Sequence, residues 1–228
     1  MERNGRFLTA AIVPGKGDAL PRQSRENMEN ELLSRLSGVR VAFCLSASYC
    51  TMDKAVAQMR RLRDHGCSIL PVISFNVRDH GSRFGTPREW RERITEASGA
   101  PIIDTIAAAE PIGPRELADV LVIAPMSGNT CAKLAQGVTD TPVLMAAKSQ
   151  LRVCRPVVVA IASNDALSAN AANLGRLLNT KHIFMTPFAQ DDPLKKPNSL
   201  VADMTQLPYT VAEALNGRQI QPLLTTFS

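Results

Sequence analysis

The chain has 228 residues, which is long enough for one large domain with a sizeable core. Its net charge of +5 and its aromatic content of 4% are too low for the basic, aromatic-rich surface of a nucleic-acid-binding protein. No apolar run approaches the roughly 20 residues of a membrane span, so we expect neither a nucleic-acid nor a membrane partner.

The sequence pattern changes near Gly38. Residues 1–37 lack sustained periodicity and are expected to form a partly irregular N-terminal extension, in which Glu29–Leu36 is the more regular segment. A repetitive pattern begins at Val39, so we read residues 38–228 as one domain. We expect residues 1–27 to be dispensable for folding, with Met28 as the start of the functional chain.

From Val39 onward, apolar runs alternate with segments of helical periodicity. Buried strands are predicted at Val39–Leu45, Cys67–Ser74, Pro101–Asp104, Asp119–Ala124, Pro156–Ala162 and His182–Met185, and Pro142–Ala146 is a further apolar run. Helices are predicted at Asp53–His65, from the capping box at Thr86, at Cys131–Val138, at Leu167–Leu178 and at Ser199–Leu215, the last kinked or split by Pro208. Arg78–Gly85 and Phe188–Asn198 are the longest irregular segments. This alternation predicts a parallel sheet covered by helices on both faces.

Cysteine and histidine spacing is uninformative for metal binding. The five cysteines are scattered without a C-x-x-C pair, and Cys44 and Cys67 lie in apolar runs where a thiol behaves as a small hydrophobe. This usage is typical of a reducing cytoplasm. The three histidines lack metal-ligand spacing, so we predict no metal site.

The stretch Ala124–Thr130 connects a strong predicted strand to a helix. In an open α/β sheet, anionic cofactors sit beyond the carboxyl ends of the strands, where helix N-termini present backbone N–H groups. Asn129 offers donors and acceptors that suit a ring with alternating carbonyls and nitrogens. The alternative interpretation of this stretch is simple helix capping, with Ser127 as N-cap.

Hydroxyl groups also follow the first two predicted strands. Ser46 and Ser48 come after the first strand, and Ser74 ends the second. Such groups at a helix N-terminus can bind one phosphate, whereas the absence of G-x-G-x-x-G disfavours a dinucleotide. Taken singly, each serine is equally explained as a cap or a turn residue.

Several motifs together resemble the B subunit of dipicolinate synthase. They are Ser46-Ala47-Ser48-Tyr49-Cys50-Thr51, Pro125-Met126-Ser127-Gly128-Asn129-Thr130, Asp140 to Lys148, Arg155-Pro156-Val157-Val158, Asn164 to Leu167, and Lys196-Pro197-Asn198-Ser199-Leu200. The Pro-x-Ser-x-Asn-Thr turn is shared with the wider flavoprotein decarboxylase superfamily. The resemblance covers roughly Gly38 to Leu223.

The resemblance implies a three-layer α/β sandwich with a parallel, flavodoxin- or Rossmann-like sheet, assembled as a homo-oligomer that binds FMN. By matching position, Ser46, Ser48 and Ser74 are expected to contact the phosphate. The turn formed by Pro125, Met126, Ser127, Asn129 and Thr130 is expected to contact the flavin or its ribityl chain.

The family's role implies an oxidoreductase that forms dipicolinate from dihydrodipicolinate in the cytoplasm of a sporulating mother cell. It works with the separate A subunit of dipicolinate synthase, which resembles an NAD(P) binder, and we expect the chain to be inactive without that partner. The dicarboxylate substrate needs cations, for which Lys148 and Lys196 are favoured over Arg152 and Lys195; Asn198 lies in the same motif as Lys196.

Two departures leave the catalytic residues unassigned. Ala47 stands where the family commonly has Gly. Because alanine is strained at positive φ, its presence requires a backbone without positive φ at that position. The related decarboxylases carry a catalytic His after the second strand, and His80 does not align convincingly with it. Two alternatives therefore stay open: a stand-alone flavin-dependent decarboxylase or prenyltransferase, and a non-catalytic flavin-fold partner of the A subunit.

Overall fold

The computed structural model describes residues 30–225, and most of the expected extension over residues 1–37 lies outside them. A short helical segment at residues 30–34 precedes the sheet. Leu32, Leu33 and Leu36 are buried in the same core as the sheet. This part of the extension therefore packs as part of the domain.

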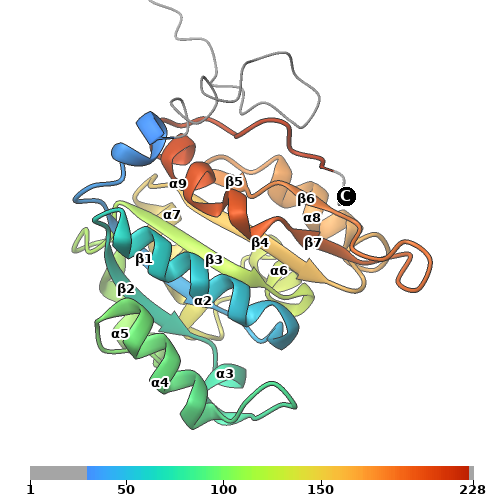
Figure 1. Ribbon diagram of the computed structural model, residues 1–228, viewed down its shortest axis with the longest axis horizontal. Coiled ribbons are helices and arrows are strands. Elements are labelled where there is room, and N and C mark those ends of the chain that lie inside the picture. Colours follow the sequence, from blue (N-terminus) through green and yellow to red (C-terminus); the bar gives the residue numbers. More distant parts are fainter. Residues whose placement is uncertain (1–29, 226–228) are drawn as a thin grey trace, which may run out of the picture.

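One twisted sheet organises the domain (Figure 1). Its strands are β1 (Arg40–Leu45), β2 (Ser68–Ile73), β3 (Val120–Met126), β4 (Val157–Ser163), β5 (Ile183–Met185), β6 (Phe188–Ala189) and β7 (Leu200–Ala202). The order is β2-β1-β3-β4-β7-β6, with β5 paired to the first half of β4. The pairs among β1 to β5 are parallel, as predicted, but β7 runs antiparallel to both β4 and β6. The sheet is thus mostly parallel rather than wholly so.

Helices cover both faces of the sheet. They are α2 (Tyr49–Asp64), α3 (Phe75–Asp79), α4 (Pro87–Ser98), α5 (Ile106–Ala109), α6 (Gly128–Ala135), α7 (Pro142–Arg152), α8 (Ala171–Leu178) and α9 (Leu207–Leu215), with 3₁₀ turns η1 (Glu110–Ile112) and η2 (Met204–Gln206). In Figure 1, α2 and α9 lie across the near face, while α7 packs behind β1 to β4. Because both faces are covered, β3 and β1 read as continuous apolar runs instead of alternating ones.

Local signals account for several helix starts. Thr86 forms the predicted capping box with Glu89, and Thr141 caps α7 through the Leu144 N–H at 3.3 Å. The apolar run Pro142–Ala146 is therefore the first turns of a helix and not a strand. Proline at the start of α7 fits because the first helical turn needs no N–H donor there.

Other predicted boundaries were wrong. The segment Ser199–Leu215 is not one helix, because it first pairs as β7 and then enters η2 and α9. Pro208 lies in the first turn of α9, where it does not kink the helix. The weak strand Pro101–Asp104 makes only an isolated bridge, from Ile103 to Val72.

The remaining differences are shifts at element ends. Helix α2 begins at Tyr49, whereas the predicted helix began at Asp53. Helix α8 begins at Ala171, whereas the predicted helix began at Leu167. The segment Arg78–Gly85 includes the end of α3, and Phe188–Asn198 begins with β6. Cys44 and Cys67 are buried as predicted, and burial raises the pKa of the Cys67 thiol to about 11.

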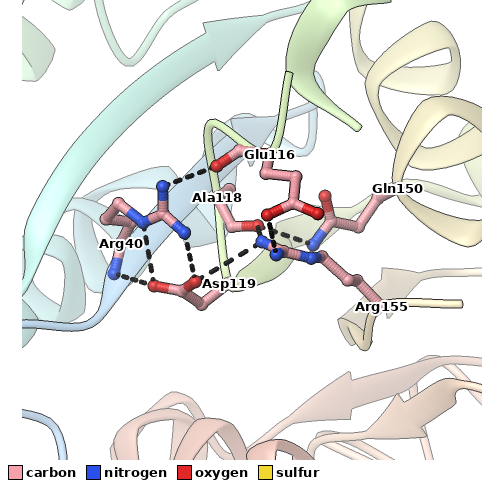
Figure 2. Close-up of polar contacts among 6 residues, drawn as sticks. All are labelled: Arg40, Glu116, Ala118, Asp119, Gln150 and Arg155. Carbon is pink, nitrogen blue, oxygen red and sulfur yellow. Dashed lines mark hydrogen bonds and ion pairs between the residues drawn. The ribbon is translucent and has the colours of Figure 1, made fainter. Parts of the chain in front are cut away.

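A charged cluster closes the amino ends of β1 and β3 (Figure 2). Arg40 donates to both Asp119 carboxylate oxygens, at 3.1 and 2.5 Å. Arg155 contacts Glu116 at 3.0 Å and Asp119 at 3.4 Å. Buried Gln150 donates to the Ala118 carbonyl at 3.3 Å. These contacts bind the start of β3 to β1 and to the segment before β4.

Candidate functional site

The strand order places a topological switch point between β1 and β3. The chain moves outward from β1 to β2 and then crosses back to β3, on the other side of β1. Crevices at the carboxyl ends of strands at such a point are the usual ligand sites of open α/β sheets. Ser46, which follows β1, and Ser127, which follows β3, therefore mark the candidate site.

Hydrogen bonds join these two strand ends directly. The buried Ser46 hydroxyl donates to the Pro125 carbonyl oxygen at 2.9 Å and accepts the Ser127 N–H at 2.9 Å. The Ser46 N–H donates to the same Pro125 oxygen at 3.3 Å. The peptide bond between Ala124 and Pro125 is cis. Ser46 thus holds the turn after β3 against the end of β1.

The serines of the site differ in how they are used. Ser127 is the N-cap of α6, where its hydroxyl accepts the Thr130 N–H at 3.3 Å, and Ser74 caps α3 by accepting the Val77 N–H at 3.5 Å. The capping interpretation therefore holds for both, although each hydroxyl retains further bonding capacity. Ser48 precedes the 16-residue helix α2 but makes no capping hydrogen bond. Its hydroxyl and the first turn of α2 are available to an anion.

A pocket of about 170 Å³ opens between these turns. Its lining combines the predicted Ser46, Ser74, Ser127, Asn129 and Thr130 with Ala47, Phe75, Asn76, Lys133, Asp140, Thr141 and Leu144. Its size is below the roughly 300–1,000 Å³ of a complete ligand site, so it suits one end of a larger ligand. The N-termini of α3, α6 and α7 meet here, which favours a negatively charged end.

Sequence reasoning missed several residues of this pocket. Lys133 forms an ion pair with Asp140 at 2.5 Å, and Thr141 caps α7. The signal for Asp140 and Thr141 was present in the Asp-Thr-Pro motif, but Lys133 has no local signature. Asn129 is exposed at the pocket, and within residues 30–225 its side chain has no hydrogen-bond partner. Its amide is free for a ligand.

A second, larger pocket of about 720 Å³ lies beside Ser48. Lys196 lines it and is paired with Asp191 at 3.0 Å, a contact that raises the Lys196 pKa. Lys54 and Gln58 of α2 line the same pocket. The structure therefore brings Lys196 close to the hydroxyl-rich turn.

The other predicted substrate residues lie elsewhere. Lys148 is on the exposed side of α7 and lines a third pocket with Arg152, of about 380 Å³. Asn198 is exposed, and its carbonyl oxygen accepts the Leu167 N–H at 3.0 Å. Pro125 and Met126 are strand residues of β3, with the Met126 side chain buried, so the turn begins only at Ser127. Neither Lys148 nor Asn198 lines the two pockets beside Ser48.

The two departures from the family pattern are resolved differently. Ala47 has no positive φ, so alanine meets no backbone strain there. His80 ends α3 at an exposed position, where its carbonyl oxygen accepts the Tyr49 hydroxyl at 2.7 Å. Of the described residues that line the pocket beside Ser46, none is a histidine.

Two kinds of feature are absent from residues 30–225. No helix there has the length and apolar character needed to cross a membrane. No group of three or more His, Cys, Asp or Glu side chains in this part of the chain is arranged to hold a metal ion.

Comparison with known proteins identifies relatives of the whole domain. Residues 29–213 match the Flavoprotein family. The B subunit of dipicolinate synthase from Bacillus subtilis (strain 168) is 48% identical over 192 residues, covering 84% of this chain and 96% of that protein. The crystal structure of the corresponding dipicolinate synthase B subunit from Bacillus halodurans C superposes with a TM-score of 0.77 at 45% identity, covering 84% of this chain and 98% of that chain.

A more distant structure shares the fold. DmrB of Burkholderia xenovorans, solved in complex with FMN, has a TM-score of 0.54 at 21% identity and covers 78% of this chain and 96% of its own. At this identity the likeness shows the fold alone.

Proposed function

Because the chain belongs to the Flavoprotein family and, within it, to the B subunits of dipicolinate synthases, we propose that it forms dipicolinate together with a second subunit. Its relative from Bacillus subtilis carries that name and is matched over nearly its whole length. Dipicolinate is the pyridine dicarboxylate of endospores, so the function belongs to a sporulating cell.

The observation that carries the proposal is the hydroxyl-lined pocket at the switch point between β1 and β3. Its uncharged donors and helix N-termini suit the phosphate of FMN, and its small size leaves the flavin ring at the mouth. We assign Ser46, Ser48 and Ser74 to the phosphate. Ser127, Asn129 and Thr130 are assigned to the ribityl chain and the ring edge, with the free Asn129 amide as the clearest ring contact.

The reaction sets the tasks of the protein. Conversion of a dihydropyridine dicarboxylate into an aromatic pyridine removes a hydride and a proton, and FMN, when bound, supplies the hydride-accepting chemistry. The side chains of this chain orient the substrate against the ring and neutralise its carboxylates. We propose that NAD(P) binds to the A subunit, so that this chain is inactive without its partner, and we assign no residue as general base.

The test combines two measurements on the purified full chain. Flavin absorbance after FMN addition reports binding, and dipicolinate formation is then assayed with and without the A subunit. We expect the purified chain to bind FMN, and we expect dipicolinate to form only when the A subunit is present. Full activity of the pair after complete removal of flavin would contradict the proposal and favour a non-catalytic partner of the A subunit.

An assay of carbon dioxide release separates the chain from a stand-alone decarboxylase. The related decarboxylases use a histidine, whereas the described residues lining the pocket beside Ser46 include none. Carbon dioxide release by the chain alone from a carboxylate substrate would favour that alternative.

A further inference from the structure

The pocket beside Ser48 has the size of a complete small-molecule site. Its volume of about 720 Å³ falls within the roughly 300–1,000 Å³ typical of such sites. It lies between α2, the end of β4, and the segments on either side of β7. Ser48 lines this pocket and follows the turn that lines the smaller one, so the two pockets are neighbours.

Of the two lysines that line this pocket, one is held in an ion pair among the described residues and the other is not. Asp191 is paired with Lys196 at 3.0 Å. Asp203 accepts hydrogen bonds from the Thr205 N–H at 3.0 Å and the Thr205 hydroxyl at 2.6 Å. Lys54 has no ion pair among the described residues. The pocket therefore offers a free ammonium group at Lys54 and a held one at Lys196.

One face of α2 presents further unsatisfied groups. Lys54 and Gln58 are four residues apart and line the pocket together. The Gln58 side-chain oxygen is buried and has no hydrogen-bond partner among the described residues. Because a dicarboxylate at neutral pH carries hydrogen-bond acceptors and no donor, Gln58 can meet it only through its N–H₂ group, with the amide turned by 180°.

We infer that this pocket binds the dicarboxylate, with Lys54 and Lys196 on its carboxylates and the N–H₂ group of Gln58 facing its ring. The inference rests on the proposed function, but it assigns the substrate to residues distinct from those that hold the flavin phosphate. Lys54 contributes the free charge, while Asp191 holds Lys196 in position. Dipicolinate itself is the natural probe, since the product keeps both carboxylates.

The experiment titrates dipicolinate into the FMN-loaded full chain by calorimetry. Lys54→Ala and Lys196→Ala should each weaken binding roughly tenfold or more, the effect of one charge-assisted contact, and Lys54→Arg should recover most of it. Lys181→Ala is the matched control. Lys181 is also exposed, but it precedes β5 at the opposite edge of the sheet, and its removal should leave the affinity unchanged.

The outcomes separate the inference from the proposed function. Equal affinities for Lys54→Ala, Lys181→Ala and the wild type would overturn the inference, as would a wild type that fails to bind dipicolinate. Dipicolinate formation by the wild-type pair, assayed separately, tells whether the proposed function survives. Unchanged flavin content in Lys54→Ala excludes loss of the cofactor as the cause of weaker binding.

Discussion

At the amino ends of β1 and β3 the polar groups bind one another, whereas the Asn129 side chain, near the carboxyl end of β3, has no hydrogen-bond partner within residues 30–225. The amino edge holds Arg40, Asp119, Arg155 and Glu116 in one network (Figure 2). The carboxyl edge holds Ser48 and Asn129, whose side chains make no comparable bond. The difference separates a part of the sheet whose polar groups stabilise the fold from a part that we propose binds a ligand.

Backbone direction explains why the two edges differ. Parallel strands bring helix N-termini, with free N–H groups, to the carboxyl edge, so anions are favoured there. At the amino edge it is carbonyl oxygens that need donors. Arg40 donates to the Glu116 carbonyl at 2.6 Å, and Arg155 donates to the Ala118 carbonyl at 2.6 Å. The Arg40 bond also holds Glu116, whose φ of 51° is unusual for a residue other than glycine.

The largest effect is expected from Gly113→Ala, near the closely packed amino edge. An added Cβ would lie 1.9 Å from the Ser149 carbonyl oxygen, a backbone atom that cannot rotate away. We expect a loss at the upper end of the roughly 1–3 kcal/mol typical of overpacking, measured by urea unfolding. Gly175→Ala is the matched control: with nothing within 4 Å of its added Cβ in the exposed interior of α8, it should gain about 0.5–1 kcal/mol.

The second prediction compares two serines of the carboxyl edge, one expected to stabilise the fold and one expected to bind FMN. Ser46→Ala should lower the free energy of unfolding by about 1–3 kcal/mol, because it removes the acceptor of the Ser127 N–H. Ser48→Ala should leave unfolding unchanged and weaken FMN binding, since its hydroxyl makes no capping bond. Equal stability losses in the two variants, measured by urea denaturation, would contradict this division.

The third prediction concerns Asn129→Ala. The side chain has no partner within residues 30–225, so the thermal midpoint should not change, while FMN affinity should fall roughly tenfold. Flavin fluorescence titration measures the affinity. Asn179→Ala, at the exposed end of α8, is the control. An unchanged affinity in Asn129→Ala would leave the residue as an ordinary part of the helix start.

The smallest effect is expected from Asp119→Ala, because this carboxylate is partly exposed. Hydrogen bonding by Arg40 holds the pKa of the Asp119 carboxyl below its ordinary value of 3.8. A lowered pKa contributes stability above the unfolded-chain value, and that contribution is lost as pH falls through the folded value. We expect the variant to be about 1 kcal/mol less stable at pH 7, discounted for solvent screening, and the difference to shrink below about pH 4. Urea unfolding at both pH values measures it, and a difference independent of pH would contradict the ionic origin.

Local sequence signals predicted much of the fold. Some signals act over only a few residues, so they can be recognised without the rest of the chain. They are the apolar runs of β1, β3 and β4 and the capping box at Thr86. Local signals gave the wrong secondary structure where pairing with a distant strand decided the conformation of a segment. Leu200–Ala202 has helix-like surroundings but pairs antiparallel with β4.

The site divides in the same way. The sequence by itself determined that hydroxyls follow β1, β2 and β3, because small polar residues after an apolar run mark a turn into a helix. Only the tertiary structure decided that Ser46 and Ser127, 81 positions apart, share a hydrogen bond, and that Ser48 makes no capping bond while Ser74 and Ser127 cap helices. It also put Lys54 and Lys196 in one pocket and Lys148 in another. The physical reason is that a side chain's partners depend on which strands become neighbours, and strand order is fixed by packing over the whole domain.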